Sequence, residues 1–108
     1  MAASLRLFLE TSMRLGTSPS SRVPTGLSLD AAGNLYVLDS FPRTIRKITP
    51  AAVVTTLAGV PGVRGVELGS LPGVFNSPTG IATLSGTGSI QFVVPDAGEN
   101  AILQVILP

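Results

Sequence analysis

The side chains that most often carry enzyme chemistry are scarce in this sequence of 108 residues, which contains no histidine and no cysteine. Within it, a Ser-His-Asp arrangement, a zinc site with imidazole or thiolate ligands and a disulfide framework are therefore excluded. Carboxylates remain, and Asp39 and Asp96 each follow an apolar run at matching points of two similar stretches. Two such carboxylates at one rim could hold Ca²⁺ if further oxygens converged. We interpret them instead as strand-end residues that accept backbone hydrogen bonds, and we predict no catalytic residue, no cofactor and no metal site.

The basic side chains form one local cluster, made of Arg43, Arg46 and Lys47. Seven basic and six acidic residues leave a net charge of +1, which provides no field for gathering nucleic acid. RNA binding would also need stacking aromatic side chains, and the sequence has one tyrosine and no tryptophan. We therefore predict that Arg46 and Lys47 face solvent on an outer strand. The glycines at 59–65 and 86–88 do not have the spacing of a dinucleotide or phosphate-binding loop.

These residues belong to a repeated unit, which must position them. The motif Pro-Thr-Gly-Leu at 24–27 returns as Pro-Thr-Gly-Ile at 78–81, followed by the same succession of apolar runs. The copies are 54 residues apart at this motif and 57 apart at Asp39 and Asp96, so the second copy has three extra residues. The extra residues lie in the turn at 84–89, because insertions are tolerated there. An internal repeat indicates an architecture built from stacked, similar units.

Short runs rich in Val, Ile, Leu and Thr, bounded by turn-forming residues, predict β-strands in both copies. The predicted strands are 25–29, 35–38, 44–48 and 53–57 in the first copy and 79–84, 91–94 and 101–106 in the second. Connections this short allow only antiparallel pairing of successive strands. We therefore expect an all-β fold with one four-stranded and one three-stranded antiparallel meander. The residues expected to shape its turns are Asp30, Gly33, Asn34, Asp39 and Asp96.

A four-stranded meander repeated at about this period is the blade of a β-propeller. The stretches 24–30, 33–40, 45–50, 54–59 and 75–80 resemble the repeat of the NHL propeller family, and the resemblance spans residues 23 to 107. It implies an incomplete β-propeller with a four-stranded first blade at 23–58, a Gly-rich inter-blade loop at 59–77 and a three-stranded partial blade at 78–108. Phe75 is expected to anchor the end of the loop in the core. The family's Gly-Asn-polar-Arg turn is replaced here by Phe41-Pro42-Arg43-Thr44, so a family member's partner is not carried across.

The resemblance implies a non-enzymatic fragment that serves as a protein-interaction scaffold and binds its partner through loops. The candidate partner-binding residues are Phe41, Pro42, Arg43, Arg64, Glu67, Glu99 and Asn100. One alternative is a fragment of a propeller enzyme, of metal-dependent lyase or hydrolase type, whose catalytic residues lie in missing blades. A second alternative is an RNA-binding propeller segment, although the charge argues against a nucleic-acid partner.

Two blades by themselves leave an apolar face and an open strand edge in water. The expected partners are therefore a protein, further propeller blades or a second copy joined through the C-terminal strand at 101–106. That strand is predicted to expose apolar groups on both faces, through Ile102, Leu103, Val105 and Ile106.

Residues 1–22 contain three arginines, five serines and a single acidic residue, which is the composition of an organelle-targeting peptide. They also suit a short helix, because Leu5, Phe8, Leu9 and Met13 share one helical face, while alternation of leucines at 5, 7 and 9 suits an extended strand. No apolar run is long enough for a membrane-spanning helix, so no membrane association is expected. The sequence leaves the compartment open.

Overall fold

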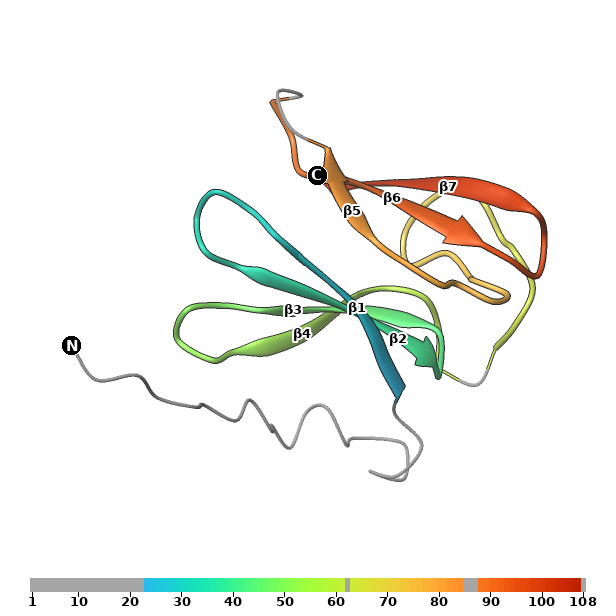
Figure 1. The fold of residues 1–108 in the computed structure, drawn as a ribbon, viewed down its shortest axis with the longest axis horizontal. Coiled ribbons are helices and arrows are strands. Elements are labelled where there is room, and N and C mark those ends of the chain that lie inside the picture. The colour runs from blue at the N-terminus through green and yellow to red at the C-terminus, as the bar shows by residue number, and fades with distance from the viewer. Residues whose placement is uncertain (1–22, 62, 85–87, 108) are drawn as a thin grey trace.

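The computed structural model describes residues 23–61, 63–84 and 88–107, which form two antiparallel β-sheets and no helix (Figure 1). The first sheet contains β1 (Val23–Leu29), β2 (Leu35–Phe41), β3 (Thr44–Ile48) and β4 (Val54–Ala58), ordered as in the chain. The second contains β5 (Ala82–Leu84), β6 (Gln91–Asp96) and β7 (Ala101–Ile106), also in chain order. The expected fold, a four-stranded antiparallel blade and a three-stranded one, is confirmed. The expectations for residues 1–22 lie outside the described residues.

The predicted strand bounds differ most at two places, and the first is the end of β2, which continues to Phe41. Pairing of Val23 with Phe41 extends the β1–β2 ladder, and only Pro42 and Arg43 remain to connect β2 with β3. In the second sheet β5 begins later than predicted, and Pro78 pairs with Asp96 in an isolated bridge. In the described residues, no helix is long and apolar enough to cross a membrane.

The strand registers confirm the repeat at the level of individual residue pairs. Leu29 pairs with Leu35 in the first sheet, and Thr83 pairs with Phe92 in the second. Further matching pairs are Ser28 with Tyr36 and Ala82 with Val93, Pro24 with Asp39 and Pro78 with Asp96, and Leu38 with Ile45 and Pro95 with Ile102. The first three strands of the first sheet are therefore equivalent, residue by residue, to the three strands of the second sheet.

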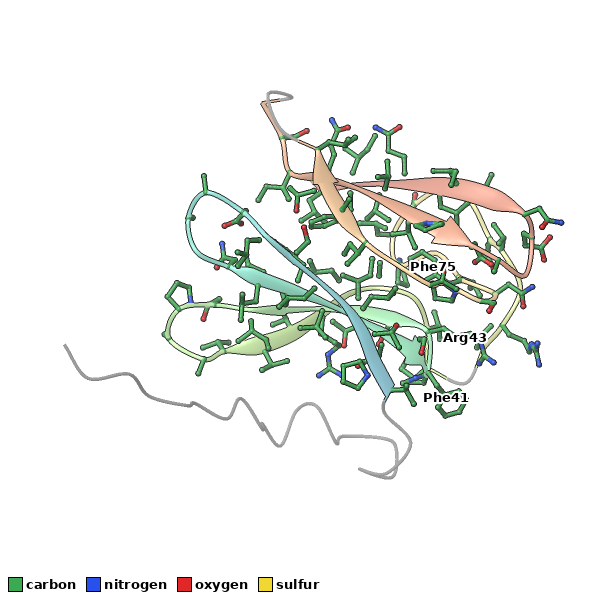
Figure 2. The ribbon with its side chains drawn as sticks, in the orientation of Figure 1. Phe41, Arg43 and Phe75 are labelled. Atoms are coloured by element: carbon green, nitrogen blue, oxygen red, sulfur yellow. The ribbon has the colours of Figure 1, made fainter. Side chains whose placement is uncertain are left out.

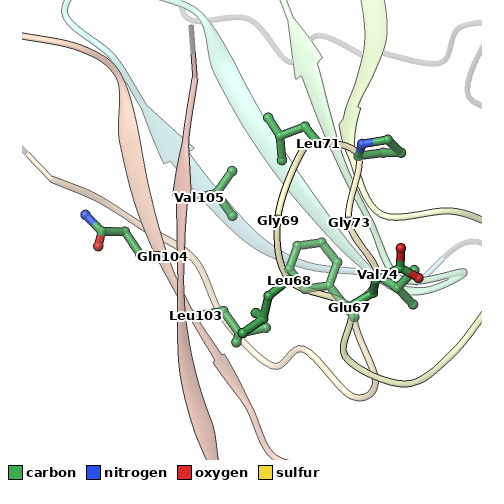
Figure 3. Close-up of a pocket in the computed structure, with 11 residues that line it drawn as sticks. Glu67, Leu68, Gly69, Leu71, Gly73, Val74, Leu103, Gln104 and Val105 are labelled. Atoms are coloured by element: carbon green, nitrogen blue, oxygen red, sulfur yellow. The ribbon is translucent and has the colours of Figure 1, made fainter.

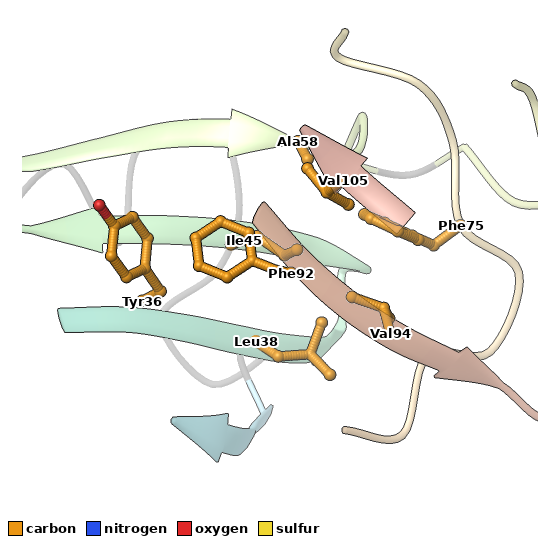
Figure 4. Packing of buried hydrophobic residues seen from close by; sticks show 8 residues of the cluster. All are labelled: Tyr36, Leu38, Ile45, Ala58, Phe75, Phe92, Val94 and Val105. Carbon is orange, nitrogen blue, oxygen red and sulfur yellow. The ribbon is translucent and has the colours of Figure 1, made fainter. Parts of the chain in front are cut away.

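The core lies between the two sheets, which pack face to face (Figure 4). Its buried residues are Tyr36, Leu38, Ile45, Ala58, Phe75, Phe92, Val94 and Val105. The rings of Tyr36 and Phe92 cross the interface with their centroids 4.5 Å apart and an interplanar angle of 53°, a tilted geometry that adds to the gain from burial. Phe75 is 4% exposed, so the expected anchoring of the loop in the core is confirmed.

Strands β1 and β5 are joined by hydrogen bonds from Thr83, which crosses from the second sheet to the first. The Thr83 backbone N–H donates to Ser28 Oγ over 3.0 Å, and Thr83 Oγ1 donates to the Leu29 carbonyl over 3.0 Å. The two hydroxyl groups also contact each other. These bonds fix the first strand of each sheet against the other.

Two sequence predictions about exposure are wrong. Arg46 was expected to face solvent on an outer strand, but it is only 3% exposed, and β3 lies between β2 and β4 rather than at an edge of its sheet. Strand β7 was expected to expose apolar groups on both faces. Its residues alternate instead: Val105 is buried in the core and Leu103 packs against it, whereas Ile102 and Ile106 point away and are exposed.

Candidate functional site

The loops at one end of the two sheets meet around Asn76, the residue that links them. The Arg43 Nε–H of the β2–β3 turn donates to the Asn76 carbonyl over 2.8 Å. The Asn76 side-chain amide donates to Glu99 Oε1 of the β6–β7 turn over 3.1 Å. The guanidinium carbon of Arg43 lies 5.3 Å from the centroid of the Phe41 ring, and both residues lie at this end of the molecule (Figure 2). We refer to Phe41, Arg43, Asn76 and Glu99 as the rim cluster.

The backbone of the β2–β3 turn determines the position of Arg43. The connection has two residues, and Arg43 adopts a left-handed φ of 75°, which is rare for a residue other than glycine. Gly59 lies directly against it: a Cβ at Gly59 would be 2.1 Å from the Arg43 carbonyl oxygen. The end of β4 therefore approaches the turn so closely that only glycine fits, and this contact holds Arg43 in place.

Beneath the rim cluster, the buried carboxylate of Asp96 accepts three backbone hydrogen bonds. Its oxygens accept from the N–H groups of Asn76, Ser77 and Gly98, over 2.9, 2.8 and 3.1 Å. Asp96 is 1% exposed, so its charge is satisfied by the end of the inter-blade loop as well as by its own turn. The equivalent residue of the first sheet, Asp39, is also fully buried. Among the described residues there is no group of three or more His, Cys, Asp or Glu that could hold a metal ion.

A second network, at the opposite end of the first sheet, is centred on Asp30. Its Oδ1 accepts from the backbone N–H groups of Ala32 and Asn34, and its Oδ2 accepts from the Asn34 amide and the Tyr36 hydroxyl, the last over 2.7 Å. Gly33, with a φ of 88°, closes this turn. Partial burial would raise the pKa of Asp30, but these hydrogen bonds outweigh it and lower the pKa from 3.8 to about 2. Burial, the hydrogen bond to Asp30 and its charge raise the pKa of Tyr36.

This network predicts an acid sensitivity. Because folding lowers the pKa of Asp30 from 3.8 to about 2, its contribution to stability is complete above pH 4 and is lost as the pH falls toward 2. We expect the urea midpoint of the wild type to fall over this range, and that of Asp30→Asn to fall less steeply. Parallel curves for the two proteins would contradict the assignment. The sign of the difference between the two proteins is the result to be tested.

The remaining candidate partner-binding residues lie outside the rim cluster, and they differ in exposure. Pro42 is fully buried, so it supports the turn and presents no surface to a partner. Asn100 is exposed in the β6–β7 turn, with a φ of 50°. Arg64 and Glu67 are exposed in the inter-blade loop, where the backbone of Glu67 pairs with that of Val74. Sequence reasoning missed Asn76, although its polar side chain, two residues before the second Pro-Thr-Gly motif, was a usable signal.

A small hollow of about 70 Å³ lies between the inter-blade loop and β7 (Figure 3). It is lined by Glu67, Leu68, Gly69, Leu71, Pro72, Gly73, Val74, Phe75, Leu103, Gln104 and Val105. Substrate pockets for drug-sized molecules are several times larger, on the order of 300 Å³ and above. The hollow is therefore suited to one inserted side chain rather than to a substrate.

No known family model matches this chain, and none of the curated proteins compared with it does so either. Its function is therefore inferred from the residues and their geometry.

Proposed function

We propose that this chain is an NHL-type β-propeller module that acts as a protein-interaction scaffold, and that the rim cluster is its partner-binding surface. The observation that carries the proposal is the exposed ring of Phe41 beside the half-buried Arg43, which is held on the rim by the hydrogen bonds through Asn76 to Glu99. Aromatic residues and arginine are the side chains most enriched where protein interfaces gain their affinity. Phe41 is 42% exposed, although it is a large apolar ring.

Rigid support of the rim cluster favours binding further. Arg43 is fixed by its turn and by the Asn76 carbonyl, and Asn76 is fixed in turn by Asp96. Loops held by a rigid β-scaffold lose little conformational entropy when a partner binds. The surface places the cation of Arg43 beside the aromatic ring of Phe41, and it would therefore fit a protein segment with an apolar side chain next to an acidic one.

The distribution of aromatic residues favours a protein partner over single-stranded RNA. Tyr36, Phe75 and Phe92 are buried in the core, so Phe41 is the one exposed aromatic side chain among the described residues. Bases of single-stranded RNA stack on several exposed aromatic rings in succession, whereas one exposed ring with an adjacent arginine is a common protein anchor.

A random peptide library displayed on phage tests the proposal. Peptides selected on the wild-type chain should bind Phe41→Ser about 30-fold more weakly, since an aromatic interface anchor contributes about 2 kcal/mol or more. Val53→Ser is the matched control, because Val53 is 55% exposed in the β3–β4 turn at the other end of the sheet. Equal binding to both variants, or binding of an oligo(U) strand at low salt without selection of any peptide, would contradict the proposal.

A further inference from the structure

Each sheet has an outer face, turned away from the shared core, that exposes apolar side chains. On the first sheet this face includes Leu27 and Leu29, which are 61% and 57% exposed, together with their half-buried strand partners Val37 and Leu35. We call these four residues the β1–β2 outer face. Further along the same face Arg46, Ile48 and Val54 are buried and Thr56 is exposed but polar, so the exposed apolar part lies on β1 and β2.

The second sheet has a corresponding β6–β7 outer face, made of Ala82, Val93, Pro95, Ile102 and Ile106. Strand pairing places Ala82 beside Val93 and Pro95 beside Ile102. Ile102 and Ile106 are 71% and 54% exposed. Solvated sheet faces usually carry polar side chains, so apolar faces of this kind indicate contact with another protein surface.

Comparison of the two repeats indicates which surface each outer face could bind, because each face corresponds to one side of the contact between the sheets. Inside the chain, Tyr36, Leu38 and Ile45 of the first sheet pack against the second sheet. Their repeat equivalents are Val93, Pro95 and Ile102, which form the β6–β7 outer face.

The partner side of the internal contact is repeated in the same way. Phe92 and Val94 of the second sheet pack against the first, and their equivalents are Leu35 and Val37 of the β1–β2 outer face. The chain therefore carries, on its two outer faces, both halves of the contact that it already makes inside.

We propose that a second copy of this chain docks its β6–β7 outer face on the β1–β2 outer face, repeating the internal sheet contact between molecules. The two surfaces are different, so the contact is head to tail and continues into a closed ring or an open array. It does not use the rim cluster, so it stands or falls independently of the proposed scaffold function.

The two glycines of the repeated motif support this geometry. Ile81 sits so close to Gly26 that a Cβ there would be 3.1 Å from Ile81 Cγ2, which means that glycine is what lets the sheets approach. The equivalent residue, Gly80, meets only Pro95, at an ordinary 3.5 Å. Glycine is thus retained at a position where a single chain has room for a side chain. In the docked pair, Leu27 of the second copy would occupy the place next to Gly80 that Ile81 occupies next to Gly26.

A change of side-chain polarity supports the same pairing. Inside the chain, Ser28 and Thr83 meet through hydrogen bonds. The residues equivalent to them are Ala82 and Leu29, both of which are exposed. The contact between copies that corresponds to Ser28 and Thr83 would therefore join Ala82 of one copy to Leu29 of the other. This contact is apolar, and burial of apolar surface drives association in water.

Complementation between two variants of the full chain tests the proposal. Leu27→Asp damages only the β1–β2 outer face, and Ile102→Asp damages only the β6–β7 outer face. By light scattering after size-exclusion chromatography, the wild type should associate, whereas each variant alone should remain at the 11.0 kDa of one chain. An equal mixture of the two should form a heterodimer, because it pairs the one intact face of each.

Gly80→Val is a second variant that leaves both apolar faces in place. In a single chain a Cβ at this position meets only Pro95, at an ordinary 3.5 Å, so the urea midpoint should stay close to that of the wild type while association weakens at least about tenfold. A monomeric wild type at micromolar concentrations would overturn the proposal. Unchanged association of Leu27→Asp would also overturn it, because the copies would then be joined without the β1–β2 outer face. So would an equal mixture of Leu27→Asp and Ile102→Asp that stays monomeric, because the two intact faces would then not bind each other.

Discussion

Replacing Phe92 with alanine is expected to remove a large part of the stability of this fold. Phe92 is fully buried between the two sheets, with its ring 4.5 Å from that of Tyr36. Truncating a buried phenylalanine costs about 3–5 kcal/mol, because apolar contact is lost and a cavity remains. Domains of this kind have about 5–15 kcal/mol in total, so the urea midpoint of Phe92→Ala should fall steeply. The fluorescence of Tyr36, the sole tyrosine, reports the transition.

Two further variants show whether the loss comes from packing between the sheets. Phe92→Leu keeps most of the buried volume and should lose clearly less stability than Phe92→Ala. Leu68→Ala removes a side chain that is 79% exposed in the inter-blade loop, and should change stability by less than about 0.5 kcal/mol. A loss below about 1 kcal/mol for Phe92→Ala would mean that the two sheets do not pack on each other in solution.

Replacing Asp96 with alanine should release the end of the inter-blade loop and destabilise the fold by about 2–4 kcal/mol. The reason is that three backbone N–H groups, those of Asn76, Ser77 and Gly98, lose their acceptor in one step. Each N–H group left in a partly buried site without an acceptor costs about 1–3 kcal/mol. Water that reaches the site and accepts from these groups reduces this cost. Amide hydrogen exchange measured by NMR should show faster exchange at these three positions.

Asp96→Asn is the matched control, because the amide keeps one carbonyl oxygen as an acceptor. It should lose less stability than Asp96→Ala and retain part of the protection from exchange. If the amides of Asn76 and Ser77 exchange equally slowly in the wild type and in Asp96→Ala, the carboxylate does not hold the loop, and the rim cluster lacks the support described for it.

The sequence by itself determined the strands, the turns and the repeat. All seven strands lie where alternating apolar runs and turn-forming residues predict them, with bounds that differ by up to three residues, as at Phe41 and Ala82. These features depend on local chemistry: the side-chain period of two, the φ freedom of Gly33, and the short side chains of Asp30 and Asn34 that bond nearby backbone. Nothing distant is needed to specify them.

Only the tertiary structure decided which face of each strand is buried and which loops meet. Strand β7 is apolar on both sides, so its sequence does not distinguish exposed Ile102 from Leu103, which packs on the core. Arg46 is buried although its charge predicts exposure. Asn76 and Asp96 meet across 20 residues. Such contacts depend on how two sheets pack in space, and local sequence patterns do not encode this packing.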